Sequence, residues 1–85
     1  MNAYIGETGL DKSWQDHFPK ETKCFKCGGV ARVMFVAQEN ERPADFITDL
    51  HNNGGKGDYW VHDAIACGVY LCKDCFEPTA ILNQA

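Results

Sequence analysis

The most apolar stretch of the chain covers residues 30–37, VARVMFVA, in which only Arg32 is charged. Its β-branched and aromatic side chains favour a strand over a short buried helix. Residues 59–66, YWVHDAIA, have a similar composition, and residues 69–71 are expected to continue this second strand after a kink at Gly68. The pattern therefore predicts two strands joined by a long connection.

The N-terminal part of the chain has a different pattern. Leu10, Trp14 and Phe18 recur every four residues, which predicts a short amphipathic helix that ends at Pro19. We interpret residues 1–20 as a partly helical arm that docks on the domain. Trp14 and Phe18 are expected to be packing residues.

Helical features also occur in the connection and in the tail. Pro43 suits a first helical turn, and the Asn-Asn-Gly-Gly run at residues 52–55 supplies a stop, so we expect a helix over residues 43–51. With the flexible tether GGKGD that follows, residues 43–57 form the predicted insertion. The tail FEPTAILNQA is predicted to be a terminal helix.

Two cysteine pairs of equal spacing flank the insertion. Cys24 and Cys27 lie in KCFKCGG, Cys72 and Cys75 lie in VYLCKDCFE, and 44 residues separate the pairs. A CxxC turn brings its sulfurs to about 3.5–4 Å, which matches tetrahedral zinc with Zn–S bonds near 2.3 Å. The four cysteines are therefore the predicted ligands of one Zn²⁺ per chain, or of iron in its place. Whether the fifth cysteine, Cys67, or a histidine replaces one ligand stays open.

The residues after the two pairs differ. Gly28 follows Cys27 and tolerates a positive φ, which indicates a knuckle on a β-turn. Phe76 follows Cys75, and bulky residues avoid a positive φ, so the second pair is expected on the first turn of a helix. One knuckle and one helix start describe a treble clef, whereas two matched knuckles would describe a rubredoxin or a symmetric zinc ribbon. The predicted fold class is α+β: a small zinc-bound treble clef of knuckle, β-hairpin and C-terminal helix, with a helical insertion.

Length, charge and cysteine count narrow the choice of function. The 85 residues predict a single domain, residues 1–85. Its apolar core is small, so the fold is expected to need a disulfide or a metal ion for stability. No basic segment followed by an apolar one opens the chain, and the longest apolar run, residues 33–37, is too short to cross a bilayer. These features favour a cytoplasmic location, where paired CxxC motifs more often bind metal than form disulfides. A net charge of −4 disfavours nucleic acid as a partner.

The cysteine motifs resemble a known family. CFKCGG followed by VYLCKDCF resembles the amino-terminal zinc-binding domain of the ClpX unfoldase. The resemblance implies ligand roles for the cysteines of both pairs, a fold that serves protein contact, and the capacity to form a homodimer. The late LCxxC is also similar to HNH endonucleases with accessory zinc, and residues 51–55 loosely resemble their His-then-Gly-Gly stretch. Phe76-Glu77-Pro78 stands where that family would place Asn or His.

The function expected from the sequence is that of a structural zinc protein that acts as a non-enzymatic protein-interaction adaptor. Four thiolates fill the zinc shell and leave no position for a reactive water. No catalytic residue is predicted, because Ser13 is the only serine and no nucleophile stands with a base. A nucleic-acid-binding or degenerate HNH-type nuclease-like zinc protein is the alternative. The expected partner is an unidentified protein, with no membrane contact.

Overall fold

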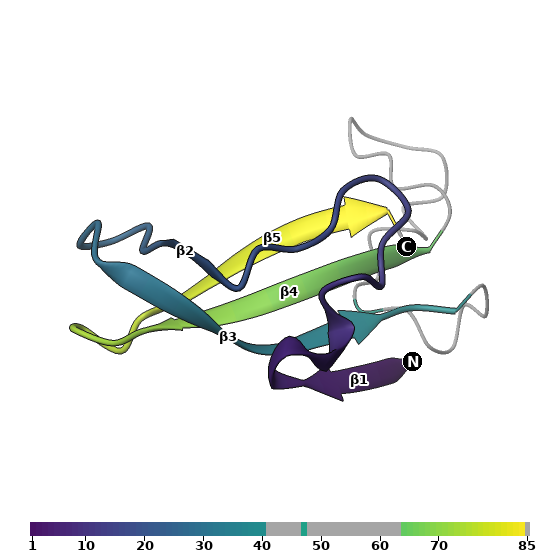
Figure 1. Cartoon of the computed structure of the whole chain (residues 1–85), viewed down its shortest axis with the longest axis horizontal. Coiled ribbons are helices and arrows are strands. Elements are labelled where there is room, and N and C mark those ends of the chain that lie inside the picture. Colours follow the sequence, from purple (N-terminus) through teal and green to yellow (C-terminus); the bar gives the residue numbers. More distant parts are fainter. Residues whose placement is uncertain (41–46, 48–63, 85) are drawn as a thin grey trace, which may run out of the picture.

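The computed structural model describes residues 1–40, 47 and 64–84, and this part of the chain forms one antiparallel sheet. The strands are β1 (Asn2–Ile5), β2 (Glu21–Lys23), β3 (Val30–Gln38), β4 (Ile65–Cys72) and β5 (Pro78–Gln84), and a 3₁₀ turn, η1 (Gly6–Gly9), follows β1. The sheet order is β1-β3-β4-β5, and β2 lies beside the start of β3 (Figure 1). The predicted strand over residues 30–37 is thus confirmed as β3. The predicted strand over residues 59–66 is described only at its end, where β4 begins.

The predicted α+β treble clef is wrong, because the described residues contain no α-helix. The tail after Cys75 is a strand, β5, that pairs with β4 from Leu71↔Pro78 to Ile65↔Gln84. Pro78 fits this position because the first residue of an edge strand needs no N–H for the ladder. The helix predicted over residues 43–51 and the tether after it lie outside the described residues, Ile47 excepted.

The predicted helix of the N-terminal arm is also absent. Phe18 is nevertheless a packing residue, with 3% of its surface exposed, whereas Trp14 is 66% exposed. A Cβ at Gly68 would lie 2.9 Å from the Phe18 ring. Gly68 therefore makes room for this ring in the middle of a continuous β4, and it does not kink the strand as predicted.

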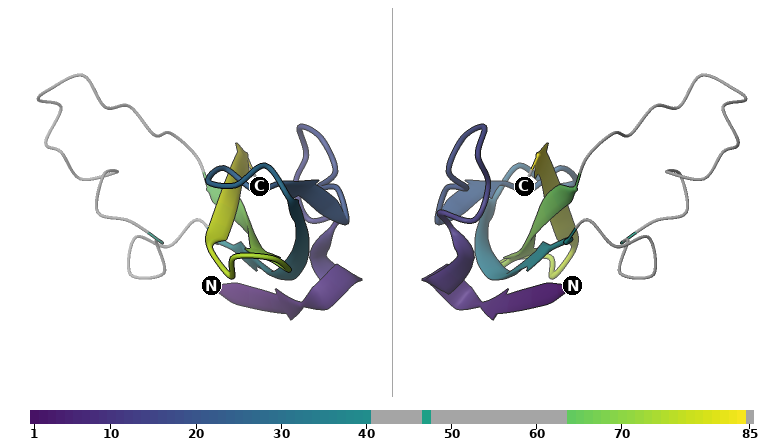
Figure 2. Two further views of the ribbon diagram at one scale, coloured as in Figure 1. Left: turned by 90° about the vertical axis from the view of Figure 1, so that its left-hand side faces the viewer. Right: turned by 90° about the vertical axis from the view of Figure 1, so that its right-hand side faces the viewer.

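A bulge in β3 decides which side chains face the interior. Val33 pairs with Tyr70 and Phe35 pairs with Val69, so Met34 is the extra residue of the bulge. The sheet curls around its inner face, as Figure 2 shows. The buried residues of that face form one cluster near the cysteines, made of Cys24, Ala31, Tyr70 and Cys72, and a distal cluster made of Phe18, Val36 and Ala66.

The middle of the outer face of the sheet is apolar as well, whereas the row nearest the cysteines carries the charged Glu21 and Arg32. Because partners in a ladder point to the same side, the pairing registers define two rows of neighbouring side chains on this face. The rows are Ile5, Phe35, Val69 and Ala80, and then Ala3, Ala37, Cys67 and Leu82. The edge strands expose the largest members most, since Ile5 is 73% and Leu82 is 63% exposed.

Candidate metal centre

The first cysteine pair lies on the turn between β2 and β3. The Gly28 N–H donates to the Cys24 carbonyl at 3.1 Å, and the Cys24 N–H donates to the Gly29 carbonyl at 2.8 Å. The N–H groups of Lys26 and Gly29 point at the sulfurs of Cys24 and Cys27, each with a distance of 3.4 Å. The turn is therefore a knuckle, in which backbone N–H groups are directed at the two sulfurs, as the sequence predicted for this pair.

The second cysteine pair, on the turn between β4 and β5, has the same hydrogen bonds. The Phe76 N–H donates to the Cys72 carbonyl at 3.0 Å, and the Cys72 N–H donates to the Glu77 carbonyl at 3.1 Å. The Asp74 N–H lies 3.4 Å from the Cys72 sulfur. This turn is a second knuckle, and the predicted helix start is wrong.

Phe76 is the residue that misled the prediction. It has a φ of +61°, next to +75° for Gly28 at the matching position of the first knuckle. Sequence reasoning assumed that a bulky residue would avoid this conformation. The structure shows that the two turns match on the far side as well: two residues separate Cys27 from β3, and two residues separate Cys75 from β5.

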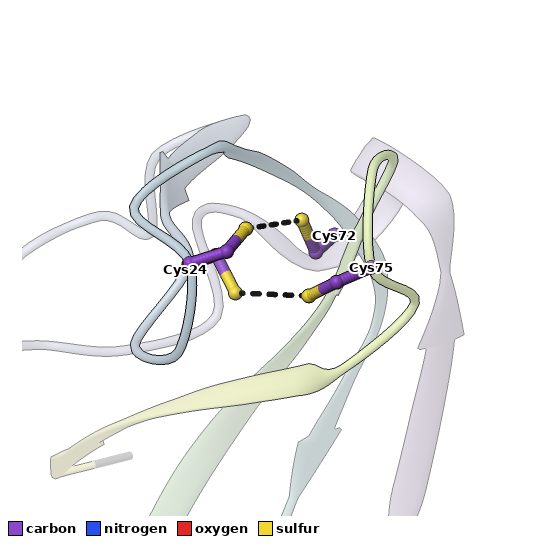
Figure 3. Close-up of side chains that lie close together, drawn as sticks. Cys24, Cys72 and Cys75 are labelled. Carbon is purple, nitrogen blue, oxygen red and sulfur yellow. Dashed lines mark hydrogen bonds between the residues drawn. The ribbon is translucent and has the colours of Figure 1, made fainter.

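The two knuckles bring the four predicted ligands together at one end of the sheet. The sulfurs of Cys24 and Cys75 are 3.7 Å apart, those of Cys27 and Cys72 are 3.5 Å apart, and all four lie within 4.8 Å of one another. Figure 3 shows Cys24 on one turn facing Cys72 and Cys75 on the other. A tetrahedron with metal–sulfur bonds of 2.3 Å has edges of about 3.8 Å, so the cluster could hold one metal ion.

The pKa values of the four thiols differ in a regular way. The largest influence on the first cysteine of each pair is the N–H of the second, which lowers the pKa of Cys24 to about 6 and also lowers the pKa of Cys72. The second cysteine of each pair is affected by the N–H two residues after it: the Gly29 N–H acts to lower the pKa of Cys27, and the Glu77 N–H acts to lower the pKa of Cys75. Neighbouring sulfurs and burial outweigh the effect of these N–H groups, so the pKa of Cys27 is raised and the pKa of Cys75 is raised to about 12. The four sulfurs therefore do not all ionise at neutral pH unless a cation neutralises them.

The remaining candidate ligands lie elsewhere or outside the described residues. Cys67 is in the middle of β4, on the outer face and not in the cluster, and burial raises the pKa of its thiol. His17 is exposed in the segment before β2. His51 and His62 fall outside the described residues. Within the described part of the chain, the four-cysteine set is thus not joined by a fifth cysteine or a histidine.

Fold and site together define a small antiparallel β-sheet protein with two matched CxxC knuckles whose four cysteines could hold one metal ion. No protein-family model matches the chain, and neither a curated protein nor a solved structure shows significant similarity to it. The resemblance to the ClpX zinc-binding domain therefore reaches only as far as the cysteine cluster, which suggests a zinc-binding site. Within the described residues, no helix is long and apolar enough to cross a membrane.

Proposed function

We propose that the chain is a non-enzymatic protein-interaction module whose fold depends on one structural zinc ion. The observation that carries the proposal is that four thiols from two distant turns lie close enough to coordinate one ion. A site with four thiolate ligands holds zinc without an open position, which suits a structural role better than hydrolysis. The apolar outer face provides a surface for a protein partner.

The composition of the core explains why zinc would matter for folding. Two of the four largest fully buried side chains among the described residues are Cys24 and Cys72. Their cluster otherwise contains only Ala31 and Tyr70, with partly buried residues packed against it. The core at this end of the sheet thus consists largely of the metal site, and structural zinc sites typically contribute about 10–16 kcal/mol to folding.

The nuclease alternative has less support. It requires a metal-binding residue on a helix after the second cysteine pair. The chain forms β5 there, and its first residue is Pro78. The net charge of −4 also disfavours binding to a phosphate backbone.

Native mass spectrometry of the purified chain, combined with chelation, tests the proposal. We expect one zinc per chain, and loss of the near-UV circular dichroism signal when a chelator removes it. Iron would instead give a coloured protein with visible absorption, in favour of a redox role. A chain that stays folded and metal-free after purification in chelator would refute the zinc-dependent module.

A further inference from the structure

β5 is an edge strand of the sheet, with β4 on one side of it and an open side opposite. It has seven residues, whereas β1 has four and β2 has three, and β2 carries the charged Glu21 and Lys23. None of the seven β5 residues is charged, and Leu82 is 63% exposed. Sheets usually protect their edges with charges, prolines or short strands, and Pro78 protects only the first position of β5. The remainder of this edge is a template for a further strand.

The hydrogen bonds of the second knuckle show which β5 residues face the open side. Hydrogen-bonded pairs alternate along an antiparallel ladder with pairs that exchange no hydrogen bonds. The Cys72 N–H donates to the Glu77 carbonyl at 3.1 Å, so these two residues form a hydrogen-bonded pair just before β5 begins. The following pair, Leu71 and Pro78, is then not hydrogen-bonded. The backbone groups that point away from β4 therefore belong to alternate residues, namely Pro78, Ala80, Leu82 and Gln84.

The other end of β5 gives the same alternation independently. Ile65, which pairs with Gln84, directs both of its backbone groups at Glu39. Its C=O accepts from the Glu39 N–H and its N–H donates to the Glu39 carboxylate, each at 2.9 Å. Gln84 directs its backbone at the N-terminal arm: its C=O accepts from the Trp14 N–H at 3.1 Å, and its N–H donates to the Gln15 side chain at 2.8 Å. The arm thus pairs with the open side at Gln84.

The pairing with the arm does not extend along β5. Among the described residues, the outward N–H groups of Ala80 and Leu82 have no hydrogen-bond partner, and neither do the outward C=O groups of Pro78, Ala80 and Leu82. These groups recur at every second residue along one edge, which is the spacing that an extended backbone matches. Their side chains are exposed, so a strand can approach them.

We propose that the open side of β5 binds an extended segment of a partner protein as an additional strand. The proposal rests on the role as an interaction module and names the kind of partner. Backbone hydrogen bonds to Ala80 and Leu82 supply the main contact, as in other cases of strand addition to a sheet edge. Because the chain has a net charge of −4, the segment is expected to be neutral or basic.

A second copy of the chain fits this edge poorly. In each copy the arm already occupies the open side at Gln84. In a two-fold antiparallel pair that matches Ala80 of one copy with Leu82 of the other, Gln84 and its arm face Pro78. Moving the register to the next matching pair in either direction places the arm opposite Ala80 or Phe76. A separate segment carries no such arm and can use the whole open side.

Amide hydrogen exchange of the zinc-loaded full chain, followed by NMR, tests the edge before any ligand is added. The amides of Ala80 and Leu82 should exchange fast, whereas those of Thr79, Ile81 and Asn83, which face β4, should be protected. Slow exchange of the Ala80 and Leu82 amides in dilute protein would mean that the edge is already covered, and it would overturn the proposal. Protection that appears only as the protein concentration rises would identify a second copy as the occupant and would also overturn it.

The probe for binding is a short peptide of alternating threonine and valine, which favour strands, with a lysine at each end. We expect a dissociation constant of about 0.1–1 mM, and protection of the Ala80 and Leu82 amides when the peptide is bound. The control peptide has the same side chains and a methyl group on every central peptide nitrogen. Because it cannot donate hydrogen bonds, it should bind at least about tenfold more weakly. No protection at about 5 mM peptide, or equal binding of the two peptides, would refute strand addition.

Two variants of the chain distinguish the edge of β5 from its outer face. Ala80→Pro removes one outward N–H and places a ring on the open side, but it leaves the ladder with β4 intact, so it should weaken peptide binding at least about tenfold. Leu82→Thr keeps the outward N–H and shortens the apolar side chain, so it should leave binding almost unchanged. Both variants should bind zinc like the parent chain. Full peptide binding by folded Ala80→Pro, or an equal loss in Leu82→Thr, would refute the edge as the site. If Ala80→Pro does not fold, the methylated peptide decides.

The failure of strand addition can be told apart from the failure of the proposed function. A folded, zinc-bound chain whose Ala80 and Leu82 amides the peptide does not protect refutes strand addition and leaves the interaction module intact. A folded chain without zinc refutes the zinc-dependent module, whatever it binds.

Discussion

The two knuckles have equivalent hydrogen bonds but are built from different residues. Each closes with an N–H from the residue after its second cysteine to the carbonyl of its first, at 3.1 Å in the first knuckle and 3.0 Å in the second. The first uses Gly28 where φ is positive, and the second uses Phe76. The comparison teaches that two sulfurs facing the other cysteine pair, and a strand on either side, can determine the conformation of the turn against local preference. Tertiary context overrides propensity here as it does in helices and strands.

The largest effect is expected from removing a ligand of the first knuckle. Cys27 is exposed and Cys67 is half-buried, so packing alone predicts that Cys27→Ser is harmless and Cys67→Ser is costly. If Cys27 is a metal ligand and Cys67 is not, Cys27→Ser should instead be the costly variant and Cys67→Ser the harmless one. We expect Cys27→Ser to lose zinc and the cooperative thermal transition, and Cys67→Ser to keep both.

Zinc content and thermal unfolding of the two serine variants check this order. Cys75→Ser extends the test to the second knuckle, and it should match Cys27→Ser if the two knuckles hold one ion. Equal zinc content in Cys27→Ser and the parent chain would remove the basis for the metal centre.

A smaller effect on stability, which differs between the two knuckles, is expected at the positions of positive φ. Gly28→Ala places a Cβ in a left-handed conformation, 3.2 Å from the Lys23 side chain, and should destabilise the protein by about 1 kcal/mol. Phe76→Gly relieves the same strain and gives up little burial, but it also makes the unfolded chain more flexible. We expect it to leave stability unchanged or raise it by up to about 1 kcal/mol.

Denaturant unfolding of both variants with zinc bound measures this difference. Phe76→Ala serves as the control, because it removes the ring and keeps the strain. A loss of stability in Phe76→Gly larger than that in Gly28→Ala would mean that the Phe76 ring contributes to folding despite its exposure.

The metal cluster could be predicted from the sequence because it depends on a local feature. Sulfurs in a CxxC turn are close whatever the rest of the chain does, and two such pairs in one short chain complete a four-thiolate shell, so the ligand set could be predicted without knowledge of the fold. The strand over residues 30–37 was equally local, since β-branched and aromatic residues fill it.

The C-terminal strand could not be predicted in this way. The segment after Cys75 contains Ala, Leu and Gln, which favour a helix in isolation. Its state is decided by a seven-residue ladder with β4, which requires the second knuckle to reverse the chain. Phe76 concealed that reversal because a bulky residue was expected to avoid a positive φ.

The smallest predicted effect concerns the N–H of the residue after the first cysteine of each pair. The Phe25 N–H donates to the Thr79 hydroxyl at 3.2 Å, whereas the Lys73 N–H donates to the Val30 carbonyl at 3.1 Å. Only the first bond can be removed by mutating a side chain. Thr79→Val should therefore destabilise the zinc-bound protein by about 0.5–1.5 kcal/mol, and Thr79→Ser should restore most of the loss.

Hydrogen exchange measures this effect where it should occur. In Thr79→Val we expect faster exchange of the Phe25 amide and unchanged exchange of the Lys73 amide, because the second knuckle keeps its backbone partner. Equal acceleration at both amides would show that the two knuckles open as one unit around the metal. The separate contribution of Thr79 to the first knuckle would then be disproved.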